Sequence, residues 1–375
     1  MAYRYPFQNL YDVNAPYFRE LEQAQLRVLH SGRYIGGPEV ENFESLLARQ
    51  THVPYAVGVT NGLDALRLIF RAYIELGRLK PGDEVIVPAN TYVASVLAVT
   101  DNGLKPVFVE PDEETMNLDS RLVEKAVTSR TRAVLTVHLY GRVAFDAVLA
   151  DVVSRHNLLL IEDNAQAIGA VSNVQGLAGT VVTGGLGHAG AFSFYPTKNI
   201  GALGDSGAVT THDKALADAV RALRNYGSDR QYHNVYKGCN CRLDPMKAAQ
   251  LAVKLPHTDE ENALRRRRAS VYDVAITNPE VRKPLFGGLD NVWHQYIVRV
   301  ADRDAFRKYL SDNGVETAVH YAVPPHRQPC YAEYAHLDLP VTVSIADTVV
   351  SLPVTRTTSE DDAREIASII NAYSN

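Results

Sequence analysis

One lysine stands alone among small and aromatic residues in the stretch GAFSFYPTKNIGALGDSGAV, residues 190–209. Between Gly190 and Gly204 the only charged side chain is that of Lys198. An amine that forms a Schiff base must be neutral at working pH, and removal from water favours the neutral form. Lys198 follows a strand-like run, and α/β proteins bind ligands at the carboxyl ends of strands. We expect a nucleophilic amine here, with a solvated loop lysine as the alternative.

A carboxylate ends another apolar run, LLLIED, at Asp163. If both runs are strands of one parallel sheet, Asp163 and Lys198 lie at the same edge. A pyridoxal phosphate ring needs a carboxylate against its protonated pyridine nitrogen, which lets the ring draw electrons from a substrate carbanion. Gln166, three residues further on, could reach the hydroxyl side of such a ring. The alternative is that Asp163 caps the turn that follows the strand.

A phosphate group would need a helix N-terminus, and the run VTNGLDAL provides one after a strand. Free N–H groups at such a helix start bind phosphate oxygens, and Gly62 lets a ligand approach the backbone closely. Strand–Gly–helix junctions are common in α/β proteins, so this signal is weak by itself. Ser193 could add a hydroxyl to the same phosphate. Tyr92, just after another strand-like run, could stack on the ring, with a core tyrosine as the alternative.

These positions require a sheet that brings several strand ends together. Short β-rich runs alternate with helical stretches from residue 55 to about residue 210. The runs are nearly continuous in Val, Ile and Leu, as expected for strands covered on both faces. The alternation predicts an α/β domain built on a largely parallel sheet. The expected strands are residues 55–60, 83–89, 105–111, 132–141, 157–165, 190–195 and 207–213, and a helix spans 61–76.

The pattern changes after a helix over residues 242–255, which ends at Pro256. We therefore expect a large domain at 1–255 and a smaller α+β domain at 256–375. Within the second we expect a charged, surface-facing helix over 261–276, because a short arginine run on a helix is usually solvated. The other expected elements are a strand at 291–300, a helix at 301–314, a strand at 315–321 and a last helix at 359–373.

Composition restricts the possible partners and location. The formal net charge is −5, which argues against nucleic acid or an anionic membrane as the main partner. No apolar run approaches the roughly 20 residues of a membrane span, and the N-terminus lacks the pattern of a signal peptide. The cysteines are Cys239, Cys241 and Cys330, an odd number that favours reduced thiols in the cytoplasm. No second pair completes a four-ligand zinc site, so we expect no metal.

Four motifs together resemble the DegT-type sugar aminotransferases, which are pyridoxal-phosphate enzymes of fold type I acting on nucleotide-linked ketosugars. They are PANTYVAS, IEDNAQAIGA, SFYPTKNIGALGD and HYAVPPHRQPCY, and the similarity extends from about residue 7 into the last helix. The resemblance implies pyridoxal 5′-phosphate in its aldehyde or aminated form (PLP or PMP), with Lys198 as the Schiff-base lysine. It also implies Asp163 at the pyridine nitrogen, Gln166 by the ring oxygen and Tyr92 over the ring. Gly62, Leu63 and Ser193 would hold the phosphate.

The segment GCNCRLD matches a family motif usually written G-[YF]-N-x-R. The resemblance implies that Asn240 completes the phosphate site of a neighbouring subunit, and so predicts a homodimer. Arg242 would hold an anionic part of the donor or substrate. Cys239 and Cys241 depart from the family pattern, which affects the packing at the subunit boundary but leaves Asn240 and Arg242 in place.

Some members of this family carry histidine in place of the lysine and catalyse dehydration. With Lys198 at this position, the resemblance implies transamination. The segments HLYGR (138–142) and RNYGSDRQYHN (224–234) resemble enzymes that aminate C3 of dTDP-3-keto-6-deoxyhexoses, with L-glutamate as the expected donor. The alternatives are a C4 aminotransferase on a 4-keto-6-deoxysugar and a non-catalytic sensor on the same fold. A dinucleotide-binding oxidoreductase is disfavoured because GGLGHAG (184–190) precedes a strand instead of joining a strand to a helix. The candidate substrate contacts are Tyr226, Tyr232, His233 and His326, the last with a surface histidine as its alternative.

Overall fold

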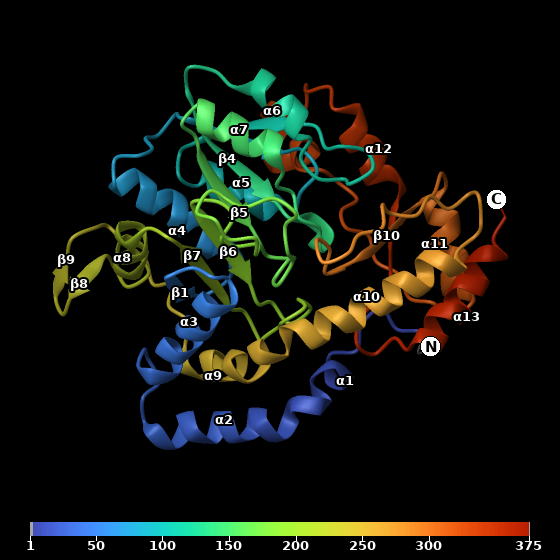
Figure 1. Cartoon of the computed structure of the whole chain (residues 1–375), viewed down its shortest axis with the longest axis horizontal. Helices are drawn as coiled ribbons and strands as arrows, with labels where there is room; N and C mark the ends of the chain where they lie inside the picture. Colours follow the sequence, from blue (N-terminus) through green and yellow to red (C-terminus); the bar gives the residue numbers. More distant parts are fainter. Residues whose placement is uncertain (1–2, 375) are drawn as a thin grey trace.

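A seven-stranded sheet is the centre of the computed structural model, which describes residues 3–374. The strand order is β1-β7-β6-β5-β4-β2-β3 (Figure 1). β7 is antiparallel to β1 and β6, and the other neighbours are parallel, so the predicted mostly parallel sheet is confirmed. The strands are β1 (Tyr55–Val59), β2 (Glu84–Pro88), β3 (Lys105–Val109), β4 (Thr131–Val137), β5 (Leu159–Asp163), β6 (Ala189–Ser193) and β7 (Gly207–Thr211).

Helices cover both faces of this sheet, which explains why its strands are rich in apolar residues. In β5, Leu159 and Ile161 pack in one core cluster, whereas Leu160 between them packs in another. Alternate residues of a strand point to opposite faces, and each fully buried Leu or Ile contributes about 1.5–3 kcal/mol. The first face carries α4 (Gly62–Glu75), α5 (Val93–Thr100) and α8 (Lys214–Leu223). The other face carries α3 (Pro38–Gln50), α6 (Ser120–Ala126), α7 (Ala147–Arg155) and α9 (Pro245–Lys254).

The N-terminal helix α2, a short hairpin and several short turns lie outside this layered core. α2 (Phe18–Ser31) runs beside α9, and Val28 of α2 packs with Ala249 of α9 (Figure 1). A short hairpin of β8 (Ser228–Arg230) and β9 (His233–Asn234) extends away from the sheet. The remaining short elements are α1 (Leu10–Asn14) and the 3₁₀ turns η1 (Ala15–Tyr17), η2 (Leu139–Gly141), η3 (Leu255–His257), η4 (Pro325–Arg327) and η5 (Pro329–Tyr334).

A second core cluster forms around an antiparallel strand pair in the C-terminal part of the chain. β10 (Tyr296–Arg299) pairs with β11 (Val349–Leu352). Tyr5, from the start of the chain, also packs in this cluster, and both termini lie on this side of the molecule (Figure 1). The surrounding helices are α10 (Thr258–Ala275), α11 (Arg303–Asp312), α12 (Pro340–Thr348) and α13 (Glu360–Asn371).

Two predictions for this region are wrong. Residues 315–321 form no strand, because the segment meets two different partners and forms only isolated bridges, from Val315 to Tyr5 and from Ala318 to Ser351. The helix over 261–276 exists as α10, but it is not uniformly solvated. Arg265 and Arg268 are buried. Backbone carbonyl groups compensate for this burial: Arg265 donates hydrogen bonds to two of them, and Arg268 donates one to the Thr358 carbonyl.

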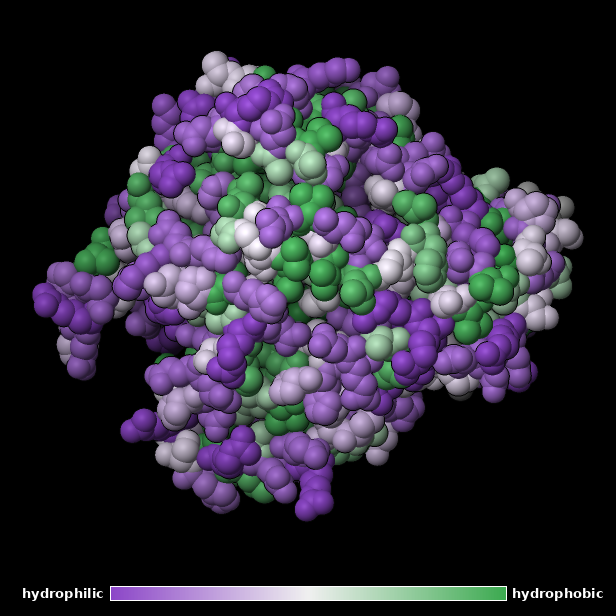
Figure 2. Space-filling view, viewed as in Figure 1, coloured by the Kyte–Doolittle hydropathy of each residue, from purple (hydrophilic) through white to green (hydrophobic). Residues whose placement is uncertain are grey.

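On the face shown in Figure 2 hydrophilic side chains predominate, and hydrophobic residues gather in smaller groups near its centre. Among residues 3–374, no helix has both the length and the apolar character needed to cross a bilayer.

Candidate active site

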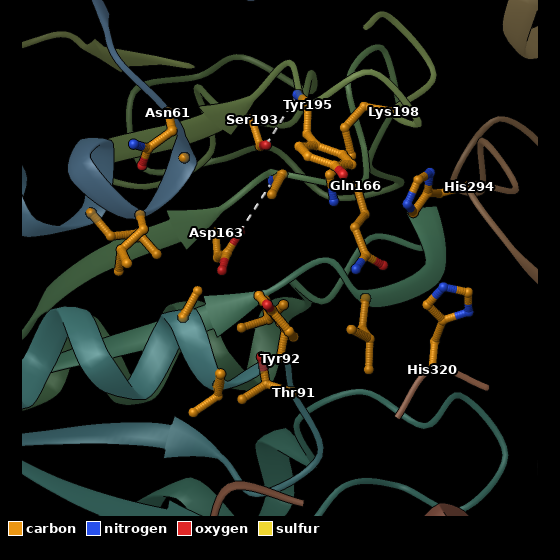
Figure 3. Close-up of a pocket in the computed structure, with 18 of the residues that line it drawn as sticks. Asn61, Thr91, Tyr92, Asp163, Gln166, Ser193, Tyr195, Lys198, His294 and His320 are labelled. Carbon is orange, nitrogen blue, oxygen red and sulfur yellow. Dashed lines mark hydrogen bonds between the residues drawn. The ribbon is translucent and has the colours of Figure 1, made fainter. Parts of the chain in front are cut away.

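A cavity of about 550 Å³ opens at the carboxyl edge of the sheet. Residues that follow β4, β5 and β6 line it, together with the first turns of α4 and α5 (Figure 3). Asp163 and Lys198 both line this cavity, as do Gly62, Leu63, Tyr92, Gln166 and Ser193. The sequence predicted that these seven residues would lie near one another, because parallel strands end at the same edge of a sheet.

Lys198 lies half-buried in the cavity wall. Burial lowers the pKa of Lys198 to about 8, although the Asp163 carboxylate opposes the shift. Because Lys198 is half-buried and lines the cavity, it is not a fully solvated loop lysine. A second lysine, Lys254, anchors the loop that follows Lys198. Its ammonium donates to the Gly201 carbonyl at 2.6 Å and to Asn14 Oδ1 at 2.8 Å.

Asp163 is buried at the end of β5, and both of its carboxylate oxygens have donors. Ser95 Oγ donates to Oδ2 at 2.7 Å, and the Ala165 N–H donates to Oδ1 at 3.1 Å. Thr91 Oγ1 lies 2.9 Å from Ser95 Oγ. The bond from Ala165 is the turn contact that the capping alternative requires, so the carboxylate stabilises the turn and also faces the cavity. The donors therefore fix the orientation of Asp163.

Gln166 and Tyr92 meet at the ring of Tyr321. The Tyr140 N–H donates to Gln166 Oε1 at 2.6 Å, and Gln166 Nε2 donates to Tyr321 Oη at 3.1 Å. The rings of Tyr92 and Tyr321 have centroids 4.9 Å apart. Tyr92 is 51% exposed, so the interpretation of Tyr92 as a core residue is wrong. It is a ring at the cavity surface, free to stack on a flat ligand.

The start of α4 faces Ser193 across the cavity floor. Asn61 caps the helix, because its side chain accepts the Asp64 N–H at 2.8 Å. The first N–H groups of a helix have no partner within it, and here they belong to Gly62 and Leu63. A Cβ atom on Gly62 would lie only 2.7 Å from Ser193 Cβ. Glycine therefore keeps the backbone of α4 and the Ser193 hydroxyl close enough to hold one small anion.

The other predicted residues lie outside this cavity. Asn240 is exposed and bridges Asn225. Arg242 donates to Asn225 Oδ1 at 2.8 Å and lies 5.5 Å from the centroid of the Tyr226 ring. Tyr232 and His233 lie on the exposed β8–β9 hairpin. Cys239 and Cys241 pack against the core beside the first sheet face, so the two departures from the family pattern help to bury apolar surface.

His326 differs from both of its predicted roles. It is fully buried in η4, outside the cavity, and both of its ring nitrogens lack a hydrogen-bond partner. Its ring packs edge-on against Phe108, because η4 turns inward beside β3. The surface-histidine alternative is therefore wrong, and the ring lines no part of the cavity described here.

Several cavity residues were not predicted from the sequence. His294, Gln295, His320 and Tyr321 reach the cavity from the C-terminal part of the chain. Burial and the positive charge of Lys198 lower the pKa of His320 to about 4. A polar pair in the middle of the apolar run NVWHQYIVRV was the signal available for His294 and Gln295. The other polar residues of the cavity that were not predicted are Asn61, Thr91, Tyr195, Thr197 and Asp205.

The arrangement combines a nucleophilic amine, a fixed carboxylate, an anion cradle and an exposed aromatic ring. Within residues 3–374, no three His, Cys, Asp or Glu side chains gather in a way that could hold a metal ion. The residues that line the cavity offer an amine and a carboxylate that can act together on a ligand with an anionic group.

Comparisons with known proteins agree with this arrangement. The chain is 45% identical to the dTDP-3-amino-3,6-dideoxy-alpha-D-galactopyranose transaminase of Aneurinibacillus thermoaerophilus, over 98% of this chain and 99% of that protein. It is also 45% identical to the dTDP-3-amino-3,4,6-trideoxy-alpha-D-glucose transaminase of Streptomyces venezuelae, over 94% of this chain and 91% of that protein. The crystal structure of S. venezuelae DesV in complex with a ketimine intermediate superposes with a TM-score of 0.92. That protein is 43% identical, and the match covers 99% of this chain and 98% of the other.

A family model matches residues 18–371, nearly the whole chain. With the relatives above, it confirms the resemblance drawn from the motifs and excludes the oxidoreductase alternative. The chain belongs to the DegT/DnrJ/EryC1/StrS aminotransferase family.

Proposed function

We propose that this aminotransferase moves an amino group from L-glutamate to C3 of a dTDP-3-keto-6-deoxyhexose, with pyridoxal phosphate as its cofactor. The observation that carries the proposal is a lysine amine with a lowered pKa in the same cavity as a buried carboxylate. The names of two relatives, both transaminases of dTDP-3-amino sugars, support the choice of C3 and of the dTDP nucleotide.

The cavity residues fit this cofactor. The first N–H groups of α4 and the Ser193 hydroxyl face one another across the space that a Cβ on Gly62 would fill, which suits a phosphate. The buried Asp163 is held by two donors and suits a pyridine N–H. Tyr92 is exposed for stacking, and Gln166 lies beside the ring of Tyr321. Bound pyridoxal phosphate would supply an aldehyde that condenses with amines and a ring that accepts electrons.

Lys198 and Asp163 would have different roles in this reaction. Lys198 Nζ, as a neutral amine, would be the base that takes the proton from the donor's α-carbon and the acid that returns it to the bound ligand. Asp163 would hold the pyridine nitrogen in its protonated form, because a buried carboxylate favours a cation beside it. When the ketosugar replaces 2-oxoglutarate, Lys198 moves the proton in the reverse direction.

Further features belong to the same proposal. We place a large domain at 1–255 and a small one at 256–375, and expect a cytoplasmic homodimer. Asn240 is exposed outside its own chain's cavity, which supports a role for it, with Arg242, in the neighbouring subunit's site. The hairpin residues Tyr232 and His233, with Tyr226, would then contact the sugar nucleotide there. We propose no substrate contact for His326, since it is buried elsewhere. A fully active monomer would contradict the shared site.

The test of the proposed function is an assay of the purified protein with L-glutamate and a panel of nucleotide ketosugars. We expect 2-oxoglutarate and an aminated sugar to form with dTDP-3-keto-6-deoxyhexoses. If only 4-keto-6-deoxysugars were turned over, the enzyme would aminate C4 and not C3, and the proposed regiochemistry would be wrong. No turnover with any ketosugar, together with a spectral response to ligand, would favour the non-catalytic sensor.

The bond from Ser95 to Asp163 gives one prediction. Ser95→Ala leaves Asp163 Oδ2 without its hydroxyl donor, and a hydrogen bond to a charged group contributes about 1.5–3 kcal/mol. We expect kcat to fall by about tenfold, because the carboxylate is no longer held in one orientation. Steady-state kinetics measures this. Thr91→Val is the matched control, since Thr91 contacts Ser95 but not Asp163. An equal loss in both variants would show that only packing matters.

The glycine at the start of α4 gives another prediction. In Gly62→Ala the new methyl group would collide with Ser193 and push the phosphate cradle open. Overpacking of this kind costs about 1–3 kcal/mol, so the affinity of the apoprotein for pyridoxal phosphate should fall by about 10- to 100-fold. Titration of the apoprotein followed by absorbance measures the affinity. Gly288→Ala is the control, because its Cβ would meet nothing closer than 3.9 Å. Unchanged affinity in Gly62→Ala would place the phosphate elsewhere.

A further inference from the structure

A hydrogen-bond chain of fixed direction runs from the backbone of η2 through Gln166 to Tyr321 at the cavity. The Tyr140 N–H donates to Gln166 Oε1 at 2.6 Å. Because a backbone N–H only donates, the end of the amide that it meets must be the oxygen. Gln166 Nε2, at the other end, donates to Tyr321 Oη at 3.1 Å. Tyr321 Oη is therefore the acceptor in this bond.

The direction of the chain leaves the hydroxyl proton of Tyr321 free. A tyrosine hydroxyl can both donate and accept, and here Gln166 uses its accepting side. Among residues 3–374, no group accepts a hydrogen bond from Tyr321 Oη. Tyr321 is half-buried and lines the cavity, where an unpaired donor is unfavourable. An acceptor atom of a bound ligand would satisfy it.

The surroundings keep this hydroxyl protonated. Burial raises the pKa of Tyr321 well above its usual value, and the neighbouring Tyr140 and Asp163 raise it further, whereas the bond from Gln166 opposes the shift. The hydroxyl of Tyr140 is itself engaged, since it donates to the His320 carbonyl. Tyr321 is thus a neutral hydrogen-bond donor at neutral pH.

The shape of pyridoxal phosphate indicates which acceptor atom this donor would meet. The ring oxygen on C3 and the phosphate-bearing carbon on C5 lie on opposite sides of the line from N1 to C4. The proposed function places N1 at Asp163 and the phosphate at the start of α4, so the C3 oxygen lies on the side away from α4. In Figure 3, Asn61, just before α4, and Gln166 lie on opposite sides of Asp163. Gln166 and its partner Tyr321 therefore lie on the side of the ring oxygen.

The ring of Tyr92 lies next to this donor. The centroids of the Tyr92 and Tyr321 rings are 4.9 Å apart, with their planes at 34°. Tyr92 is exposed to the cavity, and the proposed function has it stack on the cofactor ring. The ring that would stack and the hydroxyl that would donate are therefore adjacent parts of one cavity wall.

We infer that Tyr321 is a cofactor-binding residue whose hydroxyl donates a hydrogen bond to the C3 oxygen of the bound ring. The inference rests on the proposed function. Gln166 is then a positioning residue, because its amide determines the direction in which Tyr321 donates. A donor stabilises negative charge on the ring oxygen and makes that oxygen a weaker acceptor for the proton of the Schiff base with Lys198. Tyr321 should therefore favour the neutral Schiff base.

Tyr321→Phe removes the donor and keeps the ring that packs against Tyr92. The measurement is the pH dependence of the absorbance of the cofactor bound to Lys198, which reports protonation of the Schiff base without turnover. We expect its apparent pKa to rise by about one unit, because the charged ring oxygen loses a hydrogen bond. Tyr195→Phe is the matched control. It removes a hydroxyl from another tyrosine of the cavity, one without a bond to Gln166, and its Schiff base should titrate as in the wild type.

The histidines of the cavity do not disturb this titration. Burial lowers the pKa of His320 to about 4 and that of His294 well below its usual value. Both rings therefore stay neutral between pH 6 and pH 9, roughly the range of the measurement. The other ionisable side chains that line the cavity are Tyr92, Asp163, Tyr195 and Asp205.

A cofactor analogue separates a bond to the ring oxygen from a general packing effect. 3-Deoxypyridoxal 5′-phosphate lacks the C3 oxygen and keeps the phosphate and the pyridine nitrogen. Titration of the apoprotein gives the dissociation constants of the analogue and of pyridoxal phosphate. The ratio of the two should be about tenfold larger in the wild type than in Tyr321→Phe, because only the wild type has the donor that the analogue leaves unpaired.

A second variant tests the same bond with Tyr321 intact. Gln166→Glu keeps an oxygen that accepts the Tyr140 N–H and places a carboxylate oxygen where the amide nitrogen lay. Tyr321 would then donate to residue 166 and not to the ring oxygen, so the ratio of dissociation constants should fall as in Tyr321→Phe. This variant decides the question if Tyr321→Phe fails to fold.

Two results would overturn the inference. One is a ratio of dissociation constants that is the same in the wild type and in the folded variant. The other is an unchanged Schiff-base pKa in Tyr321→Phe, and a raised KM for the ketosugar beside it would show that the hydroxyl serves the substrate. Both results leave borohydride trapping at Lys198 intact, whereas a failure of the proposed function would abolish that trapping in the wild type.

Discussion

Lys198→Ala is expected to abolish transamination, with kcat reduced by about 10⁴-fold or more, the upper range for loss of a general acid–base group. The variant loses both the amine that condenses with the cofactor and the group that moves the proton. Borohydride reduction of the wild-type protein loaded with pyridoxal phosphate should fix the cofactor to Lys198, which peptide mass spectrometry detects. The alanine variant should bind the cofactor without any fixed product.

Lys254 is a built-in control for this experiment. Burial lowers the pKa of both lysines to about 8, so the two amines are neutral to a similar extent. Lys254 differs because it donates to Asn14 and Gly201 and lies outside the cavity. Trapping on Lys198 alone is therefore expected, since access and not only the pKa selects the nucleophile. Trapping on Lys254, or activity retained in Lys198→Ala, would contradict the assignment.

The pH dependence of cofactor loading follows from the same shift. Only the neutral amine adds to an aldehyde, and its fraction rises as pH increases through the pKa of about 8. The rate of loading of the apoprotein should thus increase from pH 7 to pH 9 and level off above that range. An amine with the ordinary lysine pKa would keep increasing in rate well beyond it.

Asp163→Asn is expected to have the second-largest effect, a fall in kcat of about 10²–10³-fold, the scale for loss of one charge-stabilising group in an active site. The amide keeps the shape of the side chain and can still accept the Ala165 N–H. It carries no negative charge, so it cannot keep the pyridine nitrogen protonated. Steady-state kinetics and the absorbance of the bound cofactor measure the change.

Thermal unfolding separates this role from the turn contact. Because Asn preserves the bond to Ala165, the midpoint of unfolding of Asp163→Asn should stay close to that of the wild type. Asp163→Ala removes both the charge and the turn contact and should lower the midpoint as well. If Asp163→Asn unfolded early but retained normal specific activity, Asp163 would serve only the turn.

The sequence alone predicted the side of the site that belongs to the first sheet. Asp163 and Ser193 end apolar strands, Tyr92 follows another strand, and Gly62 opens the helix after β1. Strands of this kind must be covered on both faces, and the carboxyl ends of parallel strands share one edge. Local pattern therefore sufficed to bring these residues together around Lys198.

The other side of the site depended on contacts between residues far apart in the chain. The predicted strand at 315–321 is absent because its residues form only isolated bridges to two separate segments, and the chain brings His320 and Tyr321 to the cavity. The arginine run resembled a solvated face, yet Arg265 is buried behind His294. His326 is also buried. The sequence did not indicate this, because a histidine in a proline-rich turn gives no local sign of what covers it.

The sequence alone determined which chemical groups the site contains, namely an amine, a carboxylate and a helix start. The periodicity of the strands and helices places these groups at the carboxyl edge of the sheet. Only the tertiary structure decided how those groups are held. Ser95 orients Asp163, and Asn199, itself bonded to Asn262, holds the ring of His294 through Nδ1. Hydrogen bonds between side chains depend on packing that no single segment specifies, whereas periodicity is a property of each segment.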